Sequence, residues 1–466
     1  MVRVAKGLTL VVGLGVSGRA ICRHLSRLEV PFMVADTRAE PPGLDDFQAA
    51  HPGIEVHCGA LTALDLRDVQ EVVVSPGLDP RMPGLALLAE QTNPHTGEPL
   101  VVGEIALFSR AAKAPIAAIT GSNAKSTVTS LLGEMAAAAG VKAAVGGNLG
   151  TPALDLLASH PDAELYILEL SSFQLETTPY LGATCAACLN LSEDHLDRHG
   201  DMRGYQAAKQ RIFIGAQHAV VNADDVLTWP VQPVPQVTDF SYKAPASDNQ
   251  WGLALHQNKL TLMQGATPWL AVDELTMAGQ HNHLNALAAL AMGQALGFAA
   301  EPMCHALCEF KGLAHRSEVI AKINGVTWIN DSKGTNVGAT LAAINGISAT
   351  LEGRLILLAG GVGKGADFSP LALPLANCAR HVLLFGLDAP RLASALIEHV
   401  SIQQVEDLTQ AIEIAFKLAQ PGDCVLLSPA CASLDQFANY QERGDVFRQC
   451  VAQIAQNSAR GRYEPH

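Results

Sequence analysis

Short apolar runs alternate along the chain with glycine-containing or polar turns and with longer helical stretches. Each run is compact enough for a buried strand, and each ends where a polar residue or a glycine begins a turn. The runs lie at residues 8–12, 32–36, 71–74, 114–120, 164–169, 354–360, 381–385 and 423–427. Strands that alternate with helices favour mostly parallel sheets covered by helices. The pattern therefore predicts an α/β protein.

The strand and helix alternation falls into three blocks. We predict a Rossmann-like domain over residues 1–104, a central P-loop domain with a parallel sheet over residues 105–312, and a second Rossmann-like domain over residues 313–466. A chain of 466 residues, 48% of them hydrophobic, is long enough to bury several cores. Neither an internal repeat nor a low-complexity tract stands out.

Charge and cysteine usage narrow the classes of partner. A formal net charge of -14, with no basic run, argues against nucleic acid and anionic membranes as partners. No apolar run reaches the length of a membrane span, and the N-terminus lacks the layout of a signal peptide. The ten cysteines are scattered, as expected for reduced thiols, so a cytoplasmic protein is expected. Cys185 and Cys188 could be half of a zinc site, but a buried strand explains them better.

The first block opens with a glycine-containing turn between a strand and a helix. Gly13, Gly15 and Gly18 have the spacing of a dinucleotide-binding turn, and Asp36 ends the second strand, where an acidic residue meets a ribose. Any nucleotide diphosphate satisfies this turn, and glycines that only pack a strand on a helix are the alternative. The Ser75-Pro76-Gly77 turn ends a third strand at the same predicted edge of the sheet.

The segment "ITGSNAKSTVTSLLGEM" resembles a phosphate-binding loop. A strand runs into Gly121 and a helix begins at Lys125, so loop N–H groups and the helix dipole face an anion. Lys125 is expected to contact the outer phosphates, and the Ser126 hydroxyl to ligate magnesium. Ala124 stands where glycine is common. We expect it to be tolerated with a negative φ.

Three further residues of the central block suggest catalysis. Glu169 ends a buried strand, where a magnesium ion bound to phosphates requires a carboxylate. His195 lies in the polar loop "NLSEDHLDRHG" and Lys209 on the helix that follows. A single histidine more often has a structural role than a catalytic one, so His195 by itself is weak evidence for a catalytic site.

Two residues of the third block lie in turns after strands. Lys364, between glycines in "GGVGKGADF", is either an anion site or a solvated lysine. Ser433 in "ACASLDQF" is either a ligand or the N-cap of a helix that is predicted over "LDQFANYQER" and carries Phe437 and Tyr440.

Several motifs in this order resemble the Mur ligase family over essentially the whole chain. They are "TGSNAKST", "ELSSFQLE", "NLSEDHLDRHG", "YQAAK", "GQHNHLNALAA", "GLAHRSE" and "NDSKGTN". The segments "INDSKGTNVGA" and "LLSPACASLDQF" are similar to those of members that add D-glutamate to UDP-N-acetylmuramoyl-L-alanine. This chain departs from the family pattern at two positions. Ala124 stands in the phosphate loop where glycine is common, and Gly334 stands where alanine is expected.

The resemblance implies three binding sites. It implies UDP rather than NAD in the first domain and ATP in the second, with D-glutamate in the third. The UDP-substrate residues implied are Gly15, Val16, Ser17, Asp36, Thr37, Arg38, Ser75, Gly77, Asn148 and Thr151. Those for ATP are Gly121, Ser122, Asn123, Ala124, Lys125, Ser126, Thr127, Val128, Asn282, Asn285, Arg316 and Asp331. Those for D-glutamate are Lys333, Thr335, Lys364, Ser433, Phe437 and Tyr440.

The resemblance also implies the chemistry. Lys125, Glu169, His195 and Lys209 are implied as catalytic residues. Two magnesium ions are implied, held through Ser126, Glu169, His195 and a CO2-derived carbamate on Lys209. ATP activates a carboxylate as an acyl phosphate, and an amine then displaces the phosphate in peptidoglycan precursor synthesis. The enzyme is expected to act as a monomer.

Two readings from other classes compete. An NAD-dependent oxidoreductase could use the N-terminal glycine turn, and a P-loop module could be purely regulatory. The oxidoreductase leaves "KST", Glu169 and the "DSK" element without a role, and we expect neither alternative.

Overall fold

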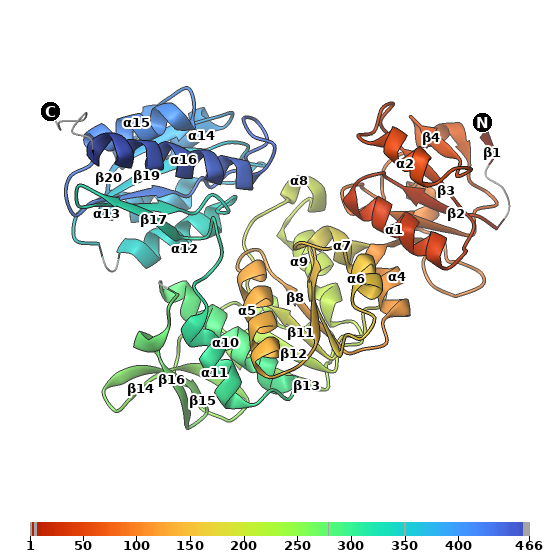
Figure 1. Cartoon of the computed structure of the whole chain (residues 1–466), viewed down its shortest axis with the longest axis horizontal. Coiled ribbons are helices and arrows are strands. Elements are labelled where there is room, and N and C mark those ends of the chain that lie inside the picture. The colour runs from red at the N-terminus through yellow and green to blue at the C-terminus, as the bar shows by residue number, and fades with distance from the viewer. Residues whose placement is uncertain (1, 4–6, 278, 349–350, 460–466) are drawn as a thin grey trace. The chain divides into compact units, whose positions relative to one another are not determined.

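Three large β-sheets, one in each block of the sequence, organise the chain (Figure 1). The computed structural model describes residues 2–3, 7–277, 279–348 and 351–459. Most neighbouring strands are parallel, so the predicted α/β class with three domains is confirmed.

The first sheet is parallel, in the order β4-β3-β2-β6-β7. Its strands are β2 (Thr9–Val12), β3 (Phe32–Asp36), β4 (Val56–Cys58), β6 (Glu71–Val74) and β7 (Val101–Gly103), beside the pair β1 (Val2–Arg3) and β5 (Leu64–Asp65). Its helical segments are α1 (Val16–Arg27), α2 (Leu44–Ala50), η1 (Leu61–Ala63) and α3 (Ala86–Ala89). The strand order reverses between β2 and β6, and ligands of such sheets bind at the carboxyl ends of strands at such a reversal.

The second sheet has nine strands, in the order β16-β15-β14-β13-β12-β11-β8-β10-β9. They are β8 (Ile116–Thr120), β9 (Ala143–Gly147), β10 (Leu165–Glu169), β11 (Cys185–Cys188), β12 (His218–Asn222), β13 (Gln236–Phe240), β14 (Gln250–His256), β15 (Lys259–Gln264) and β16 (Thr267–Ala271). β8 to β13 are parallel to their neighbours and β14 is parallel to β13, whereas the β14–β15 and β15–β16 pairs are antiparallel. β8, with every residue buried, lies between β11 and β10 and leads into the phosphate loop.

The helices of the central block connect these strands. They are α4 (Glu104–Ala111), α5 (Lys125–Ala138), α6 (Ala153–Ser159), α7 (Ser172–Glu176), α8 (Leu196–His199), α9 (Met202–Gln210), η2 (Arg211–Phe213), η3 (Val226–Thr228), η4 (Val272–Glu274), α10 (Gln280–Ala295) and α11 (Ala300–Glu309). Helix α5 packs on β8, β9 and β10, which fixes its first turn at the ends of these strands.

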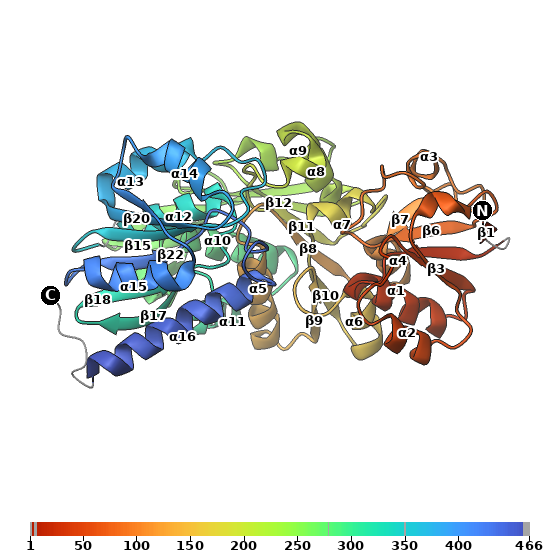
Figure 2. The ribbon, with the colours of Figure 1, turned by 90° about the horizontal axis from the view of Figure 1, so that it is seen from above.

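The third sheet has the order β17-β18-β22-β19-β20-β21, and only its β17–β18 edge is antiparallel. Its elements are β17 (Glu318–Ile323), β18 (Val326–Asn330), α12 (Val337–Ser348), β19 (Leu355–Gly360), η5 (Ser369–Leu371), α13 (Ala372–Cys378), β20 (Ala379–Phe385), α14 (Ala389–Leu396), β21 (Ile402–Gln404), α15 (Leu408–Leu418), β22 (Cys424–Leu427) and α16 (Tyr440–Ala459). Alternate residues of β19 enter two cores: Leu355 and Leu357 pack with residues of α12 to α14, and Ile356 and Leu358 pack with residues of α15 and α16. Figure 2 shows α13 and α14 on one side of this sheet and α15 and α16 on the other.

The chain divides into two compact units. The first contains residues 1–191, 203–274 and 284–308, and the second contains residues 192–202, 275–283 and 309–466. The polar loop with His195 thus belongs to the same unit as the third sheet. The boundaries at residues 104 and 312 stay a prediction.

The predicted helix after Ser433 starts later than expected. Residues 434–439 form turns and bends, and α16 begins at Tyr440. Phe437 therefore precedes the helix, and its N–H donates to the carbonyl oxygen of Ser433 at 2.9 Å. Over the described residues, no helix combines the length and the apolar character that a membrane span needs.

Candidate active site

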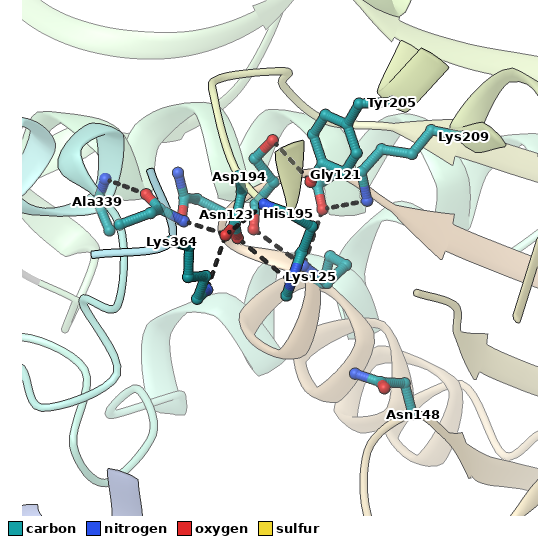
Figure 3. Close-up of polar contacts among 12 residues, drawn as sticks. Gly121, Asn123, Lys125, Asn148, Asp194, His195, Tyr205, Lys209, Ala339 and Lys364 are labelled. Atoms are coloured by element: carbon teal, nitrogen blue, oxygen red, sulfur yellow. Dashed lines mark hydrogen bonds and ion pairs between the residues drawn. The ribbon is translucent and has the colours of Figure 1, made fainter. Parts of the chain in front are cut away.

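The phosphate loop joins β8 to α5 in the first unit (Figure 3). The Lys125 ammonium folds back over the loop and donates to the carbonyl oxygens of Gly121 at 2.8 Å and Ser122 at 2.9 Å. Asn190 braces the turn, because its side chain accepts from the N–H of Asn123 at 2.8 Å and donates to the Asn123 carbonyl at 3.2 Å. The loop is thus held in shape by a residue that follows a neighbouring strand.

Ala124 differs from our expectation. Its φ is +66° and its ψ is -6°, which is the left-handed region, so the prediction of a negative φ was wrong. An L-residue with a Cβ pays about 1 to 2 kcal/mol in this conformation, which explains why glycine is common here. The loop geometry, held by Asn190, prevails over the preference of the alanine.

Glu169 lies at the carboxyl end of β10, and Ser126 lies at the start of the helix that follows β8. Glu169 is buried, and its Oε1 accepts from the Asn148 amide at 2.6 Å. Ser126 is buried in the first turn of α5. A carboxylate and a hydroxyl beside a phosphate site are hard ligands of the kind that magnesium prefers. The donor set therefore fits one magnesium ion completed by phosphate oxygens.

Lys209 lies beneath the phosphate loop. Its side chain is buried, and its ammonium donates to the Gly121 carbonyl at 2.9 Å and to the Thr120 hydroxyl at 3.3 Å. The nitrogen also lies 4.8 Å from the centre of the Tyr205 ring, and the Tyr205 hydroxyl is within 3.1 Å of the Ser122 hydroxyl. A carbamate on this nitrogen keeps one N–H, which is enough to donate to Gly121 while an anion forms beyond it. The position is thus compatible with the modification.

The glycines of the turn in the first sheet differ in whether a side chain would fit at their positions. A Cβ on Gly18 would lie 1.7 Å from the Gly13 carbonyl oxygen, and Gly13 itself has a φ of +96°. These two glycines are required by the fold. A Cβ on Gly15 meets nothing within 4 Å, so protein packing does not demand glycine there.

Asp36 holds the same turn. Its carboxylate accepts from the N–H of Leu14 at 2.7 Å and from the Arg38 guanidinium at 2.7 and 2.8 Å. Burial alone raises the pKa of Asp36, but the hydrogen bonds from Arg38 and Leu14 outweigh it and lower the pKa. Ser75 closes the turn from β6 by donating to the Gly13 carbonyl at 3.0 Å.

In the second unit, Asp194 joins the His195 loop to the third sheet (Figure 3). Its Oδ1 accepts from the Lys364 ammonium at 2.8 Å, and its Oδ2 accepts from the Asn336 amide at 3.3 Å. The His195 Nε2 lies 3.6 Å from Oδ2, and the His195 backbone is left-handed with a φ of +54°. Lys364 is therefore neither solvated nor open, and an internal carboxylate holds it.

Asp331 and Lys333 follow β18 in the "DSK" element. Asp331 is buried and accepts from the Ser428 hydroxyl at 2.7 Å and the Ser317 N–H at 3.0 Å. Burial raises its pKa to about 6, against the lowering effect of these hydrogen bonds and of Arg316. The Lys333 ammonium lies 4.0 Å from the centre of the Tyr440 ring.

Arg443 of α16 is fully buried and connects three loops of the third sheet. It donates to the Ser332 carbonyl at 2.8 Å and hydroxyl at 3.0 Å, to the Cys431 carbonyl at 3.1 Å and to the Gly360 carbonyl at 3.5 Å. Burial lowers its pKa to about 10. These loops lead to Lys333, Ser433 and Lys364 respectively, so one guanidinium fixes all three candidate amino-acid ligands.

The structure thus distributes the predicted residues over the two units. The first unit holds Gly15, Val16, Ser17, Asp36, Thr37, Arg38, Ser75, Gly77, Asn148, Thr151, Glu169, Lys209, Asn285 and the loop 121–128. The second holds His195, Asn282, Arg316, Asp331, Lys333, Thr335, Lys364, Ser433, Phe437 and Tyr440. The sequence reasoning missed Asn190, Asp194, Tyr205, Asn336 and Arg443. Asp194 adjoins His195 in a polar loop, which was a usable signal, whereas Arg443 gave none.

Cys185 and Cys188 lie inside a buried strand. Both are fully buried in β11, and burial raises the pKa of both thiols to about 12. The buried-strand interpretation is therefore confirmed. Among the residues that the structure describes, no group of three or more His, Cys, Asp or Glu side chains is placed to hold a metal.

Models of three protein families match the chain in succession. They are described as the N-terminal domain of Mur ligases like MurD over residues 7–97, the Mur ligase middle domain over residues 119–293 and the Mur ligase glutamate ligase domain over residues 315–431.

Curated relatives match nearly the full length. A UDP-N-acetylmuramoylalanine–D-glutamate ligase of Chromohalobacter salexigens is 63% identical over 452 residues, which cover 97% of this chain and 98% of that protein. The ligase of the same name from Pseudomonas putida is 50% identical over 96% of this chain and 97% of its own.

Solved structures share the fold at low identity. A pseudomurein peptide ligase type C from Methanothermus fervidus has a TM-score of 0.61 at 17% identity, over 96% of this chain and all of its own. The UDP-N-acetylmuramate-alanine ligase MurC of Thermotoga maritima has a TM-score of 0.59 at 16% identity, over 97% of this chain and 99% of its own.

Proposed function

The chain belongs to the Mur ligase family, and on that premise we propose that it joins D-glutamate to UDP-N-acetylmuramoyl-L-alanine at the expense of ATP. The observation that carries this proposal is the match over nearly the whole length to relatives named for this reaction. A ligase with three substrates needs all of its domains. Similarity confined to one nucleotide site would therefore not be enough to propose this reaction. The reaction belongs to cytoplasmic peptidoglycan precursor synthesis, and hence to cell-wall growth and division.

The first domain is assigned the UDP moiety. The open space at Gly15 and the N-terminus of α1 support a diphosphate there, because free N–H groups at a helix start attract anions. Asp36, held by Leu14 and Arg38, faces the same turn. Val16, Ser17, Thr37, Arg38, Ser75 and Gly77 complete this assignment, with Asn148 and Thr151 for the muramoyl peptide.

The loop 121–128 is assigned the phosphates of ATP. Lys125 is already directed over the loop carbonyls, so its ammonium can turn to outer phosphates with a short movement. Asn282, Asn285, Arg316 and Asp331 are assigned to the base and sugar. Asn282 and Asn285 both lie on α10, and Asp331 is fixed by Ser428.

Two magnesium ions are assigned to side chains of this chain. Ser126 and Glu169 would hold one ion through a hydroxyl and a carboxylate, and the His195 imidazole with a carbamate on Lys209 would hold the second. When bound, these cations reduce the repulsion between the phosphate groups and the carboxylate that attacks them. Tyr205 and Gly121 orient the Lys209 nitrogen, and Asn148 orients Glu169.

The amino acid is assigned to the third domain. Lys364 and Lys333 supply positive charges, and Thr335 and Ser433 supply hydroxyl donors for two carboxylates. Phe437 and Tyr440 flank the site. Arg443 supports this assignment, because it fixes the loops that bear Lys333, Lys364 and Ser433.

The reaction follows from these positions. A carboxylate oxygen of the UDP substrate attacks the γ-phosphorus of ATP, and ADP leaves, which gives an acyl phosphate. The neutral amine of D-glutamate then attacks the acyl carbon. The tetrahedral adduct expels phosphate and the nitrogen loses its proton, so an amide forms. Lys125 balances negative charge on the phosphoryl group during transfer.

Phosphate release tests the proposal. Inorganic phosphate should appear only when ATP, UDP-N-acetylmuramoyl-L-alanine and D-glutamate are all present. Replacement of D-glutamate by D-alanine or L-glutamate is the matched control. NADH formation, or phosphate release without the amino acid, would favour the oxidoreductase or the regulatory module instead.

A further inference from the structure

The Lys364 ammonium is occupied by a carboxylate of the protein itself. Asp194 accepts from Lys364 through one oxygen and from Asn336 through the other, at 2.8 and 3.3 Å. The side chains of both members of the ion pair are largely buried, with exposed fractions of 18% for Lys364 and 9% for Asp194. A partly desolvated charge pair with a second donor is held more firmly than a surface pair.

Little space remains on the side of Lys364 that faces Asp194. A cavity of about 10 Å³ separates the two loops, lined by Glu193, Asp194, Leu196, Thr335, Asn336, Gly363, Lys364 and Ala366. This space holds about one water molecule. A substrate carboxylate that binds Lys364 on this side therefore competes with Asp194 for the ammonium.

The Asp194 carboxylate is chemically the same kind of group as the substrate carboxylate that would replace it at Lys364. Its two oxygens accept from the Lys364 ammonium, the Asn336 amide and the His195 N–H, and a carboxylate of D-glutamate can accept from the ammonium and the amide. An amino acid without a second carboxylate would leave Lys364 without an anion after displacing Asp194. Such an exchange is costly, since it strands a partly buried charge.

We propose that Asp194 is a specificity-determining residue that occupies Lys364 in place of a substrate carboxylate and gives way only to an amino acid with a second carboxylate. This inference rests on the proposed function, since Lys364 is assigned there to D-glutamate. The apparent affinity for the amino acid then equals the intrinsic affinity multiplied by the fraction of molecules in which Asp194 does not hold Lys364.

The test compares Asp194→Asn with wild type in steady-state phosphate release, with D-glutamate varied at saturating ATP and UDP substrate. The KM for D-glutamate should fall by about three- to tenfold, because the internal competitor loses its charge. The value of kcat should stay within about threefold. Glu193→Gln is the matched control: Glu193 borders the same cavity but pairs with no cation within the described ranges, so its KM should not change.

Lys364→Ala supplies the second arm. If Asp194 acts through Lys364, then Asp194→Asn should have no effect on the KM for D-glutamate in the Lys364→Ala background. A fall that persists in this background would overturn the proposal. So would a KM that is unchanged or raised in the single variant, or a loss of kcat alone, which would assign Asp194 to orienting His195.

A readout without turnover separates this inference from the proposed function. Acetic anhydride should label Lys364 faster in Asp194→Asn than in wild type, measured by mass spectrometry, because the pairing carboxylate protects the amine. Equal labelling would overturn the inference even in an active ligase. Faster labelling in a protein without D-glutamate-dependent phosphate release would keep the Asp194–Lys364 pair and reject the proposed function.

Discussion

The Lys209 ammonium lies 2.9 Å from the carbonyl oxygen of Gly121, the first residue of the phosphate loop. A change at the lysine nitrogen is therefore transmitted directly to the loop that is assigned to ATP. The Tyr205 ring, near both Lys209 and Ser122, strengthens this connection.

We predict that Lys209→Ala is nearly inactive and that formate or acetate partly restores its activity. A small carboxylate can occupy the space of the lost side chain and supply the oxygens that a carbamate would present to magnesium. Phosphate release with and without 100 mM-scale formate measures the effect, which should be about tenfold or more. Lys209→Arg retains the charge but cannot form this carbamate, and normal activity in that variant would contradict the prediction.

Lys125→Ala should abolish phosphoryl transfer, with a loss in kcat on the order of a hundredfold or more. Binding of the UDP substrate should change by less than about threefold, since the UDP moiety is assigned to the first domain and Lys125 lies in the phosphate loop of the central domain. Calorimetry and phosphate release measure the two effects. Lys113→Ala, at an exposed lysine of the same unit, is the control.

Ala124→Gly should raise the free energy of unfolding by about 0.5 to 1 kcal/mol. Glycine removes the cost of about 1 to 2 kcal/mol for a left-handed alanine, and part of the gain is offset by the greater freedom of glycine in the unfolded chain. Urea unfolding measures the difference, and kcat should change little. Ala137→Gly, at an exposed helical position of α5, should instead destabilise by about 0.5 to 1 kcal/mol. Destabilisation at residue 124 would show that the Ala124 methyl group makes a needed contact.

Lys364→Ala should raise the KM for D-glutamate by about thirtyfold or more, since removing a charged partner from a desolvated carboxylate costs about 2 to 5 kcal/mol. The KM for the UDP substrate should change much less. Lys417→Ala, at an exposed lysine of α15, should leave both constants unchanged. A shift in ATP saturation alone would place Lys364 in a different site.

Asp331 should make the protein less stable as the pH rises through about 4 to 6. Its folded pKa of about 6 lies above its ordinary value of 3.8, so the folded state binds more protons in this window. The unfolding free energy then decreases with rising pH, by up to about 3 kcal/mol at 1.36 kcal/mol per unit. Asp331→Asn should therefore gain stability relative to wild type between pH 4.5 and pH 7.5 in urea unfolding. Glu398→Gln, at an exposed position of the same unit, should show no such gain.

Local patterns predicted the sheets and the phosphate loop, because a buried strand and the turn after it are written in adjacent residues. Glu169 was found in this way, at the end of the apolar run that forms β10. The same patterns did not reveal the antiparallel edge of β15 and β16 or the late start of α16. Strand direction and helix starts depend on packing that a short window does not contain.

Contacts between distant residues were beyond such patterns. The loop that contains Ala124 is braced by Asn190, which is 67 residues from its partner Asn123 in the sequence. Asp194 and Lys364 are separated by 170 residues, so nothing near either residue announced their pairing. Whether a contact could be predicted from the sequence depended on how far apart its two residues are in the chain, and not on the strength of the contact.

The buried guanidinium of Arg443 has a consequence for the order in which the protein becomes competent during its synthesis. Helix α16, which carries it, is the last element of the described chain. Domains fold in order as the chain leaves the ribosome, so the loops that bear Lys333, Lys364 and Ser433 are made well before the residue that fixes them. A nascent or prematurely terminated chain could therefore form its phosphate loop while its amino-acid loops still lacked their common anchor. The loops that bear Lys333, Lys364 and Ser433 thus gain their common anchor only after α16 has been made.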